Sequence, residues 1–258
     1  MCSTCGCGVT EDISIQKPGE VESPVRETPV DHHVGHEHHH HHDKTILEVE
    51  QDILQVNQLL AERNRGYFLG KNIFAINLVS SPGSGKTTLL EKTLTDLKSK
   101  INFYVIEGDQ QTMNDANRID ALQIPVVQIN TGKACHLDST MVSNAILKLK
   151  PESNAVVMIE NVGNLVCPAA FDLGENARVV IISTTEGDDK PIKYPDMFDG
   201  SQVCIINKID LLPYVNFNME KAKEFARQVN PNIEFFEISS ITGEGMDKWY
   251  EWLKIKIK

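Results

Sequence analysis

Basic residues are scarce in this sequence relative to acidic ones, 25 against 36, which leaves a net charge of −11. A broad basic face of the kind that holds nucleic acid or anionic lipid is therefore excluded, and any phosphate site must be local. No apolar run approaches the roughly 18–20 residues of a membrane-spanning helix, and no apolar segment of a secretory signal follows the N-terminus. We therefore expect a cytoplasmic protein that binds neither nucleic acid nor membrane.

An even spread of cysteines is also missing, since three of the six crowd the first seven residues. A secreted disulfide scaffold does not have that distribution, so reduced thiols that bind metal or act in redox chemistry are favoured. A structural zinc finger needs four ligands, and no second CxxC occurs. A thioredoxin-like pair follows a strand of a folded domain, whereas these cysteines precede every predicted element.

The segment MCSTCGCG (residues 1–8) is therefore interpreted as a metal clamp formed by Cys2, Cys5 and Cys7. Three thiolates need one more donor. If Met1 is removed, the α-amine of Cys2 would complete an S₃N set. A near-planar set of that kind suits Ni²⁺ better than Zn²⁺.

Residues 1–43 as a whole carry few large apolar side chains, and eight of the nine histidines of the chain lie between His32 and His42. Such a stretch buries too little surface to offset its ordering entropy, which predicts a disordered, Cys/His-rich metal-binding tail. An expression tag is the alternative for the histidines. The interrupted pattern HHVGHEHHHHH and its place within the chain favour a native metal-binding tract.

From residue 44 the pattern is that of a folded α/β domain, predicted over 44–258. Ile46, Val49, Ile53, Val56 and Leu60 recur at spacings of three and four, which predicts a helix over 44–66 with one apolar face. Apolar runs then alternate with helix-length segments, which indicates a doubly wound, mostly parallel sheet with a terminal helix at 245–258. The predicted strands are 73–80, 103–108, 124–130, 155–160, 178–184, 203–207 and 233–239.

The first of these strands runs into SSPGSGKTT (80–88), a phosphate-binding loop in which Ser80 stands at the first glycine position of GxxxxGK[ST]. Backbone N–H groups of such a loop converge on phosphate oxygens, and the positive end of the following helix favours the same anion. Lys86 would reach the β and γ phosphates, and Thr87 would ligate Mg²⁺. The residues predicted to hold the phosphates are Gly83, Ser84, Gly85, Lys86, Thr87 and Thr88.

The nucleotide base is predicted from VCIINKID (203–210), in which a strand ends in NKxD. Asp210 would accept hydrogen bonds from guanine N1–H and the 2-amino group, which adenine does not present in that arrangement. The stem of Lys208 would lie along the base, and Asn207 would brace the neighbouring loops. EISSITGEG (237–245) fits the last guanine-side loop, and these residues together predict GTP as the nucleotide. Its residues near the base are Ser239, Ser240 and Ile241.

Two acidic positions complete a hydrolytic set. Glu160 takes the aspartate position of DxxG in ENVG, where Gly163 would give its N–H to the γ-phosphate. Asp109 in FYVIEGDQQT would hold waters of Mg²⁺ or orient the attacking water, whereas Glu107 fits better as an exposed residue near a strand end. Catalysis would consist of positioning and charge neutralisation by Lys86, Thr87, Asp109 and Glu160. With no glutamine or arginine finger assigned, slow turnover is expected.

A second metal site is predicted from Cys135 and His136 in TGKACHLD and from Cys167 in ENVGNLVCP. Both segments leave strands at the carboxyl edge of a parallel sheet, so they can approach each other near the nucleotide. Two thiolates and an imidazole suit Zn²⁺ or Ni²⁺. A pair of buried, inert cysteines is the alternative, and Cys204, inside a strand, is assigned that inert role.

These motifs together (CxxCGC, SSPGSGKTT, EGDQQT, GKACHLD, ENVGNLVCP, NKID and SSITGEG) resemble the hydrogenase nickel-incorporation GTPases over residues 1–8 and 44–258. The resemblance implies GTP hydrolysis during maturation of [NiFe]-hydrogenases and a GTP-dependent homodimer with the second metal site near its interface. It also implies a nickel-accessory protein and a hydrogenase large subunit as partners.

Two alternatives remain beside that resemblance. A urease-accessory nickel GTPase typically lacks the N-terminal CxxCGC and uses a CPH motif, which this chain does not have. A nickel store or sensor with a vestigial GTPase domain is disfavoured by the intact Lys86, Thr87 and NKID. Deletion of residues 1–43 separates a store from a delivery GTPase, because only the GTPase keeps its function without the tail.

Overall fold

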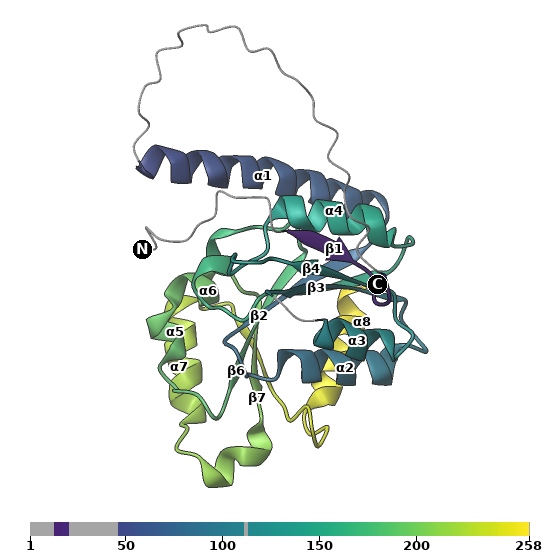
Figure 1. Ribbon diagram of the computed structural model, residues 1–258. Coiled ribbons are helices and arrows are strands. Elements are labelled where there is room, and N and C mark those ends of the chain that lie inside the picture. Colours follow the sequence, from purple (N-terminus) through teal and green to yellow (C-terminus); the bar gives the residue numbers. More distant parts are fainter. Residues whose placement is uncertain (1–12, 21–45, 111–112, 258) are drawn as a thin grey trace, which may run out of the picture.

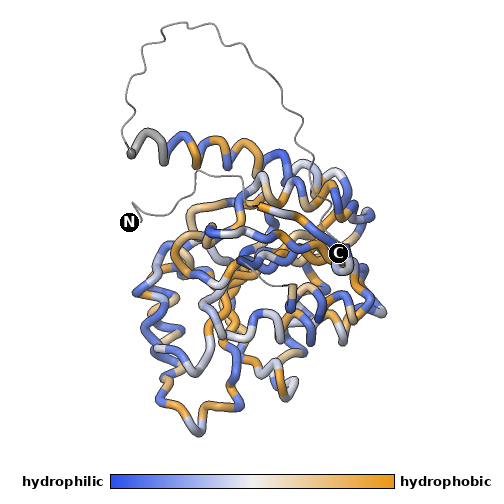
Figure 2. The backbone as a smooth tube through the Cα atoms, in the orientation of Figure 1, coloured by the Kyte–Doolittle hydropathy of each residue, from blue (hydrophilic) through white to orange (hydrophobic). Residues whose placement is uncertain are grey.

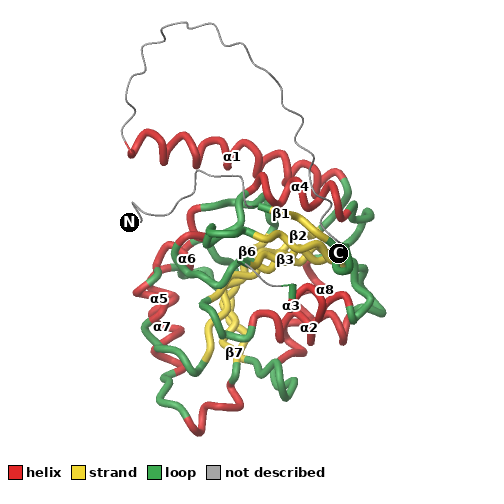
Figure 3. The backbone as a smooth tube through the Cα atoms, in the orientation of Figure 1, coloured by secondary structure: helices red, strands yellow, loops and turns green. Residues whose placement is uncertain are grey.

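The computed structural model describes residues 13–20, 46–110 and 113–257, and side chains from residue 51 onward in the second range. A central sheet is enclosed by helices on both faces, and the strands gather in the middle of the molecule (Figures 1 and 3). Among the described residues no helix combines the length and the apolar composition needed to cross a membrane.

The sheet has the strand order β1-β4-β3-β5-β2-β6-β7-β8, and every pair is parallel except β1 with β4. This is the doubly wound, mostly parallel α/β architecture that the sequence predicts. The strands are β1 (Ser14–Gln16), β2 (Phe74–Ser80), β3 (Phe103–Asp109), β4 (Val126–Asn130), β5 (Val156–Glu160), β6 (Ala177–Ser183), β7 (Val203–Asn207) and β8 (Glu234–Glu237).

Helices cover both faces of this sheet. On one face α2, α3 and α8 pack on a core that includes Trp249, and on the other α1, α4, α6 and α7 pack on two further apolar clusters. The α-helices are α1 (Ile46–Gly70), α2 (Lys86–Leu97), α3 (Asn114–Asp120), α4 (Ser139–Leu149), α5 (Lys190–Lys193), α6 (Pro195–Asp199), α7 (Met219–Val229) and α8 (Met246–Lys256).

The seven strands predicted from apolar runs are confirmed within a few residues at each end. The runs are apolar throughout because the central strands are covered on both faces: all seven residues of β6 and all five of β5 and β7 are buried. Figure 2 shows this as a largely hydrophobic centre. Helix α2 also turns one mostly apolar side to the sheet, and its buried residues are Leu89, Leu90, Thr93, Leu94 and Leu97.

The apolar face predicted for the first helix is wrong at Ile53 and Val56, which are 40% and 56% exposed. Within its described side chains the helix instead buries Asn57, Ala61, Asn64 and Phe68. Asn57 Oδ1 accepts from the backbone N–H of Ser139, and Asn64 Nδ2 donates to the Ser139 carbonyl. Hydrogen bonds to the start of α4 therefore orient α1, and a hydrophobic-periodicity rule cannot detect them.

The prediction of disorder for residues 1–43 does not hold for the part of the tail that is described. Ser14, Ile15 and Gln16 form β1 and pair with β4, although the segment is short and poor in large apolar residues. The existing sheet supplies the hydrogen-bond partners, so the segment needs little core of its own. Residues 1–12, which contain Cys2, Cys5 and Cys7, and residues 21–45, which contain the histidine tract, lie outside the described residues.

Candidate nucleotide and metal site

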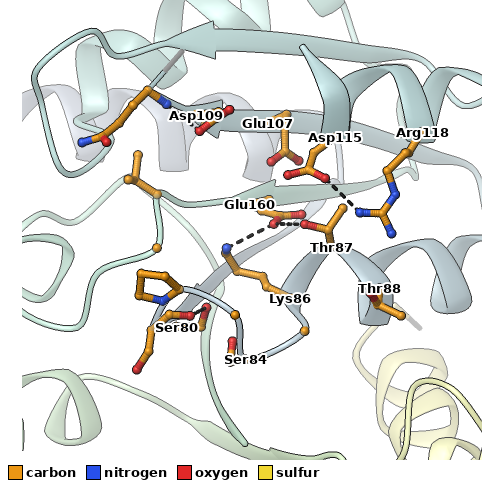
Figure 4. Close-up of a pocket in the computed structure, with 18 of the residues that line it drawn as sticks. Ser80, Ser84, Lys86, Thr87, Thr88, Glu107, Asp109, Asp115, Arg118 and Glu160 are labelled. Carbon is orange, nitrogen blue, oxygen red and sulfur yellow. Dashed lines mark hydrogen bonds and ion pairs between the residues drawn. The ribbon is translucent and has the colours of Figure 1, made fainter. Parts of the chain in front are cut away.

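The loop between β2 and α2 borders a cavity of about 570 Å³ at the carboxyl edge of the sheet. All six predicted phosphate-binding residues line it, together with Glu107, Asp109, Glu160, Gly163 and Lys208 (Figure 4). Ser80 is the last residue of β2 and lacks a positive φ angle, which explains why no glycine is needed there. Gly85 has a φ of 94°, and an added Cβ would lie 2.5 Å from Asn207 Nδ2.

Lys86, Thr87 and Glu160 form one connected group in the wall of this cavity. Lys86 Nζ lies 3.1 Å from Glu160 Oε1, and the Thr87 hydroxyl donates to the same oxygen over 2.8 Å. Burial by itself lowers the pKa of Lys86, but the carboxylates of Glu160 and Glu107 outweigh burial and raise it. Lys86 therefore stays cationic, and Glu160 holds it in the place where a phosphate would compete for it.

Glu107 is buried, not exposed as expected, and is only 2% accessible. Burial and the neighbouring charge of Glu160 raise its pKa well above the ordinary value. The feature of the sequence that indicates this burial is the position of an acidic residue inside the apolar strand FYVIEG. The Oε2 atoms of Glu107 and Glu160 have no hydrogen-bond partner among the described residues.

These oxygens fit a Mg²⁺ site. Mg²⁺ prefers oxygen ligands and keeps several waters. Here the Thr87 hydroxyl donates to Glu160, whose carboxyl group lies next to that of Glu107. Figure 4 shows these side chains together with Asp115 around one end of the cavity. Asp109, at the end of β3, lines the same cavity farther along.

Helix α3 contributes two residues to this wall that sequence reasoning missed, Asp115 and Arg118. Arg118 is held by Glu91, at 2.5 Å, and by Asp115, at 2.9 Å. An isolated arginine on a short helix has no motif around it, so no sequence pattern identified it.

The predicted guanine-side loops are joined by Asn207. Its Nδ2 donates to the Ser84 carbonyl, and its Oδ1 accepts from the backbone N–H and the hydroxyl of Ser240. Lys208 has a φ of 62° and donates from Nζ to the Gly83 carbonyl. These bonds connect NKxD, the phosphate loop and the last guanine-side loop, which is the bracing expected of Asn207.

The remaining residues of these loops differ in exposure. Asp210 Oδ1 is buried and has no partner among the described residues, so this carboxylate is available to a ligand. Ser239 is fully buried, and its hydroxyl accepts from the Thr242 backbone N–H. Ile241 is 76% exposed, so it lies at the open side of the loop.

A further set of contacts missed by sequence reasoning holds the phosphate loop from the side of β6. The Ser81 hydroxyl donates to Glu186 Oε2 over 2.8 Å, and Lys190 Nζ lies 3.1 Å from both Ser81 Oγ and Glu186 Oε2. The feature of the sequence that could have indicated these contacts is the segment TTEGDDK, which follows a buried strand and carries a glutamate and a lysine four residues apart.

Cys135, His136 and Cys167 meet at the same edge of the sheet, as the sequence predicts. Their ligand atoms all lie within 4.8 Å of one another, and Cys135 Sγ is 3.9 Å from His136 Nδ1. Burial lowers the pKa of His136, and the ring stacks on Phe171 with centroids 3.9 Å apart. The neutral imidazole, held by this stacking, and two half-exposed thiols form a set of three donors among the described residues that suits a thiophilic divalent cation.

Asn161 connects this metal cluster to the nucleotide cavity. Its Oδ1 accepts from the backbone N–H of Leu137, next to His136, and from that of Val162, at 3.1 and 2.9 Å. Two residues after Asn161, a Cβ on Gly163 would lie 3.2 Å from Pro82 Cα in the phosphate loop. The segment that contacts the phosphate loop is thus hydrogen-bonded to the loop that carries Cys135 and His136, and it continues along the chain to Cys167.

Comparison with known proteins identifies the family. Residues 74–237 match the model of the CobW/HypB/UreG nucleotide-binding domain. The chain is 46% identical to the hydrogenase maturation factor HypB of Escherichia coli K12 over 98% of each chain. It is 53% identical to that of Rhizobium leguminosarum over 81% of this chain and 70% of the relative. The chain belongs to the HypB family of hydrogenase maturation factors.

A solved HypB structure supports the same assignment at the level of the fold. The crystal structure of HypB from Helicobacter pylori in complex with nickel is 38% identical, with a TM-score of 0.74, over 78% of this chain and 94% of that one. Within the HypB domain of the present chain, Cys204 is fully buried in β7 and burial raises its pKa, in keeping with the inert role predicted for it.

Proposed function

We propose that this chain is a GTP-hydrolysing nickel metallochaperone that delivers Ni²⁺ during [NiFe]-hydrogenase maturation. The observation that carries the proposal is the tie made by Asn161 between the loop at the nucleotide cavity and the Cys–His–Cys cluster. The nickel-bound HypB of Helicobacter pylori supports nickel as the cargo. The NKxD arrangement and the free carboxylate oxygen of Asp210 support guanine as the base.

Hydrolysis is assigned to residues that surround the phosphates. Lys86 would leave Glu160 for the β and γ phosphates, and the Gly163 N–H would donate a hydrogen bond to the γ-phosphate. Thr87 and Glu160 would hold Mg²⁺, which neutralises the phosphate charge, and Asp109 would orient the attacking water. Arg118, the arginine that lines this cavity among the described residues, is held by two carboxylates, which fits the slow turnover expected.

The bound nucleotide would change nickel affinity by changing the position of the side chains that bind the metal ion. A γ-phosphate contact at Gly163 moves the segment that includes Asn161 and, four residues beyond Gly163, Cys167. Nickel affinity responds only if the ion binds the two nucleotide states differently, because coupling between sites is a difference of binding free energies. A coupling of about 1–3 kcal/mol, or roughly 5- to 150-fold in affinity, is the usual range.

The cluster supplies three donors, and a fourth would come from water or from a second copy of the chain. We therefore include a GTP-dependent homodimer in the proposal, with a nickel-accessory protein and a hydrogenase large subunit as partners. Zn²⁺ competes for the same donors, because thiolates and imidazole bind both ions. The N-terminal Cys2, Cys5 and Cys7 would capture nickel.

The test is a nickel titration of the full chain with GDP and with a non-hydrolysable GTP analogue, in parallel with a measurement of molecular mass in solution. Cys135→Ala removes the cluster, and Cys204→Ala is the matched control at an inert cysteine. We expect a several-fold difference in nickel affinity between the two nucleotide states, which Cys135→Ala abolishes. Equal nickel affinity and equal oligomeric state with both nucleotides would refute the proposal.

A further inference from the structure

The backbone around Cys167 forms a short turn with weak internal hydrogen bonding. Cys167 begins the 3₁₀ helix η2 (Cys167–Ala170), which is four residues long, and the N–H of Phe171 closes it with a bond of 3.4 Å to the Pro168 carbonyl. Hydrogen-bond geometry in such short 3₁₀ helices is poor. Contacts from other segments are therefore needed to hold the Cys167 thiol in a fixed place.

Arg178, on strand β6, supplies such contacts. Its Nη1 donates to the Ala169 carbonyl and its Nη2 to the Phe171 carbonyl, each over 3.0 Å. The Arg178 side chain is buried. Because a guanidinium is planar and its N–H groups point in fixed directions, two such bonds set both the position and the orientation of the turn.

The same turn also supports the imidazole of the cluster. Phe171, whose carbonyl accepts from Arg178, stacks its ring on His136 with centroids 3.9 Å apart. The ligand atoms of Cys167 and His136 lie within 4.8 Å of each other. A displacement of the turn would therefore move the Cys167 thiol and the support of the His136 ring together.

Glu175 fixes the guanidinium in turn. Its Oε1 accepts from Arg178 Nε over 3.2 Å and from Asn77 Nδ2 over 3.1 Å, and its Oε2 accepts from the Leu173 N–H over 2.7 Å. Both members of this ion pair are buried. Desolvation offsets most of the attraction in a buried ion pair. The main consequence of the arrangement is therefore the orientation of Arg178 toward the turn.

We propose that Arg178 is a positioning residue of the Cys135–His136–Cys167 cluster. It holds the turn that carries Cys167, and the ring that stacks on His136, in the geometry that binds the metal ion. Arg178 acts through two backbone carbonyls and does not contact the ion. This proposal rests on the proposed nickel function and adds to it a residue that lies outside the nucleotide and metal motifs.

The direct test is a nickel titration of the full chain that carries Cys2→Ser, Cys5→Ser and Cys7→Ser, followed by thiolate–nickel absorption. These changes remove the thiolates of the tail from the signal. Arg178→Lys keeps a positive charge beside Glu175 but replaces the planar fork with one ammonium group, which cannot donate to both carbonyls in the same geometry. Residues that orient metal ligands commonly contribute 10- to 100-fold in affinity, so a loss of at least about tenfold is expected.

Two matched measurements separate positioning from a general loss of stability. Val179→Ala changes the next residue of β6, which is fully buried in the apolar cluster on the face covered by α2 and α8. It weakens the same strand and leaves nickel affinity unchanged. In a Cys167→Ser background, Arg178→Lys should cost less than about threefold, because two changes that act through one ligand are not additive.

Gly200→Ala provides a milder variant that keeps every hydrogen-bonding group. A Cβ at Gly200 would lie 3.0 Å from Arg178 Nη1, so the guanidinium must shift by a few tenths of an ångström. Gly200 has a φ of −77°, which alanine adopts without strain. We expect a several-fold loss of nickel affinity in a chain whose denaturant unfolding stays cooperative.

The outcomes separate this proposal from the proposed function. A loss of about tenfold in Arg178→Lys, absent from Val179→Ala and reduced in the Cys167→Ser background, supports positioning by Arg178. Unchanged nickel affinity in Arg178→Lys, or an equal loss in either matched measurement, overturns it. If Arg178→Lys does not fold, Gly200→Ala decides: a loss supports the proposal and an unchanged affinity overturns it. No thiolate–nickel absorption in the chain that carries the tail substitutions alone would instead overturn the proposed nickel function.

Discussion

Guanine recognition by Asp210 provides the sharpest single-residue prediction. Its Oδ1 is buried and has no partner among the described residues, so the carboxylate is not committed to the protein. Asn207, three residues earlier, is fully engaged by Ser84 and Ser240 and holds the loop in place. Asp210→Asn therefore changes the hydrogen-bonding character of the site without removing its support.

The expected loss follows from the hydrogen bonds exchanged. Asn keeps one acceptor oxygen, but its amide N–H₂ group faces a donor of guanine. Hydrogen bonds to charged groups contribute about 1.5–3 kcal/mol, and an unpaired buried donor costs a further 1–3 kcal/mol. A total near 3 kcal/mol corresponds to roughly a 100-fold weaker affinity for GDP. A xanthine nucleotide, which has a carbonyl in place of the 2-amino group, regains a partner for the amide N–H₂ group.

Equilibrium binding of GDP and XDP at fixed Mg²⁺ measures both effects. Asp247→Asn is the matched control, because Asp247 is an exposed aspartate in the first turn of α8. We expect Asp210→Asn to prefer XDP over GDP and Asp247→Asn to behave as the unmodified chain. An unchanged GDP affinity in Asp210→Asn, with no gain for XDP, would refute guanine reading by this loop.

Three further predictions concern the buried polar groups and the cluster. The raised pKa of Glu107 means that the nucleotide-free folded chain binds a proton that the unfolded chain releases, so its contribution to stability is lost as pH rises through the folded pKa. Denaturant unfolding from pH 5 to 8 should show a shallower decline for Glu107→Gln; equal slopes would contradict this. Asn161→Ala removes the acceptor for two backbone N–H groups, so a loss of about 2 kcal/mol in unfolding free energy is expected. The same change should make nickel affinity less sensitive to the bound nucleotide. Full retention of that sensitivity would show that the hydrogen bonds of Asn161 do not couple the cluster to the nucleotide cavity. Cys167→Ser weakens nickel binding at the cluster by at least tenfold, whereas Cys204→Ser leaves it unchanged; the reverse order in a nickel titration would contradict the assignment.

Much of the fold and of the site was predictable because its signals are local in sequence. The strands are recognisable as apolar runs, since a parallel strand covered on both faces needs no polar alternation. SSPGSGKTT and NKID combine residue types that few other folds require at that spacing. The proximity of Cys135, His136 and Cys167 follows from their positions along the chain, because parallel strands release their following loops at one edge.

Other features depended on contacts between distant segments, which no local pattern encodes. The face of α1 was predicted wrongly because Asn57 and Asn64 are buried by hydrogen bonds to α4, more than 70 residues away. The burial of Glu107 depends on its neighbours across the sheet. The contacts of Ser81 with Glu186 and Lys190 join loops about 105 residues apart.

The amino-acid sequence alone therefore determined the class of fold, the nucleotide motifs and the types of metal ligand, because each depends on composition and short-range spacing. Only the tertiary structure decided how these parts are connected. The hydrogen bonds of Asn161 connect the segment at the nucleotide cavity to the loop that carries Cys135 and His136, and Lys148 with the edge of β4 holds strand β1 on the sheet. Both depend on hydrogen-bonding groups that are common in any sequence and acquire a specific partner only when the sheet brings distant segments together.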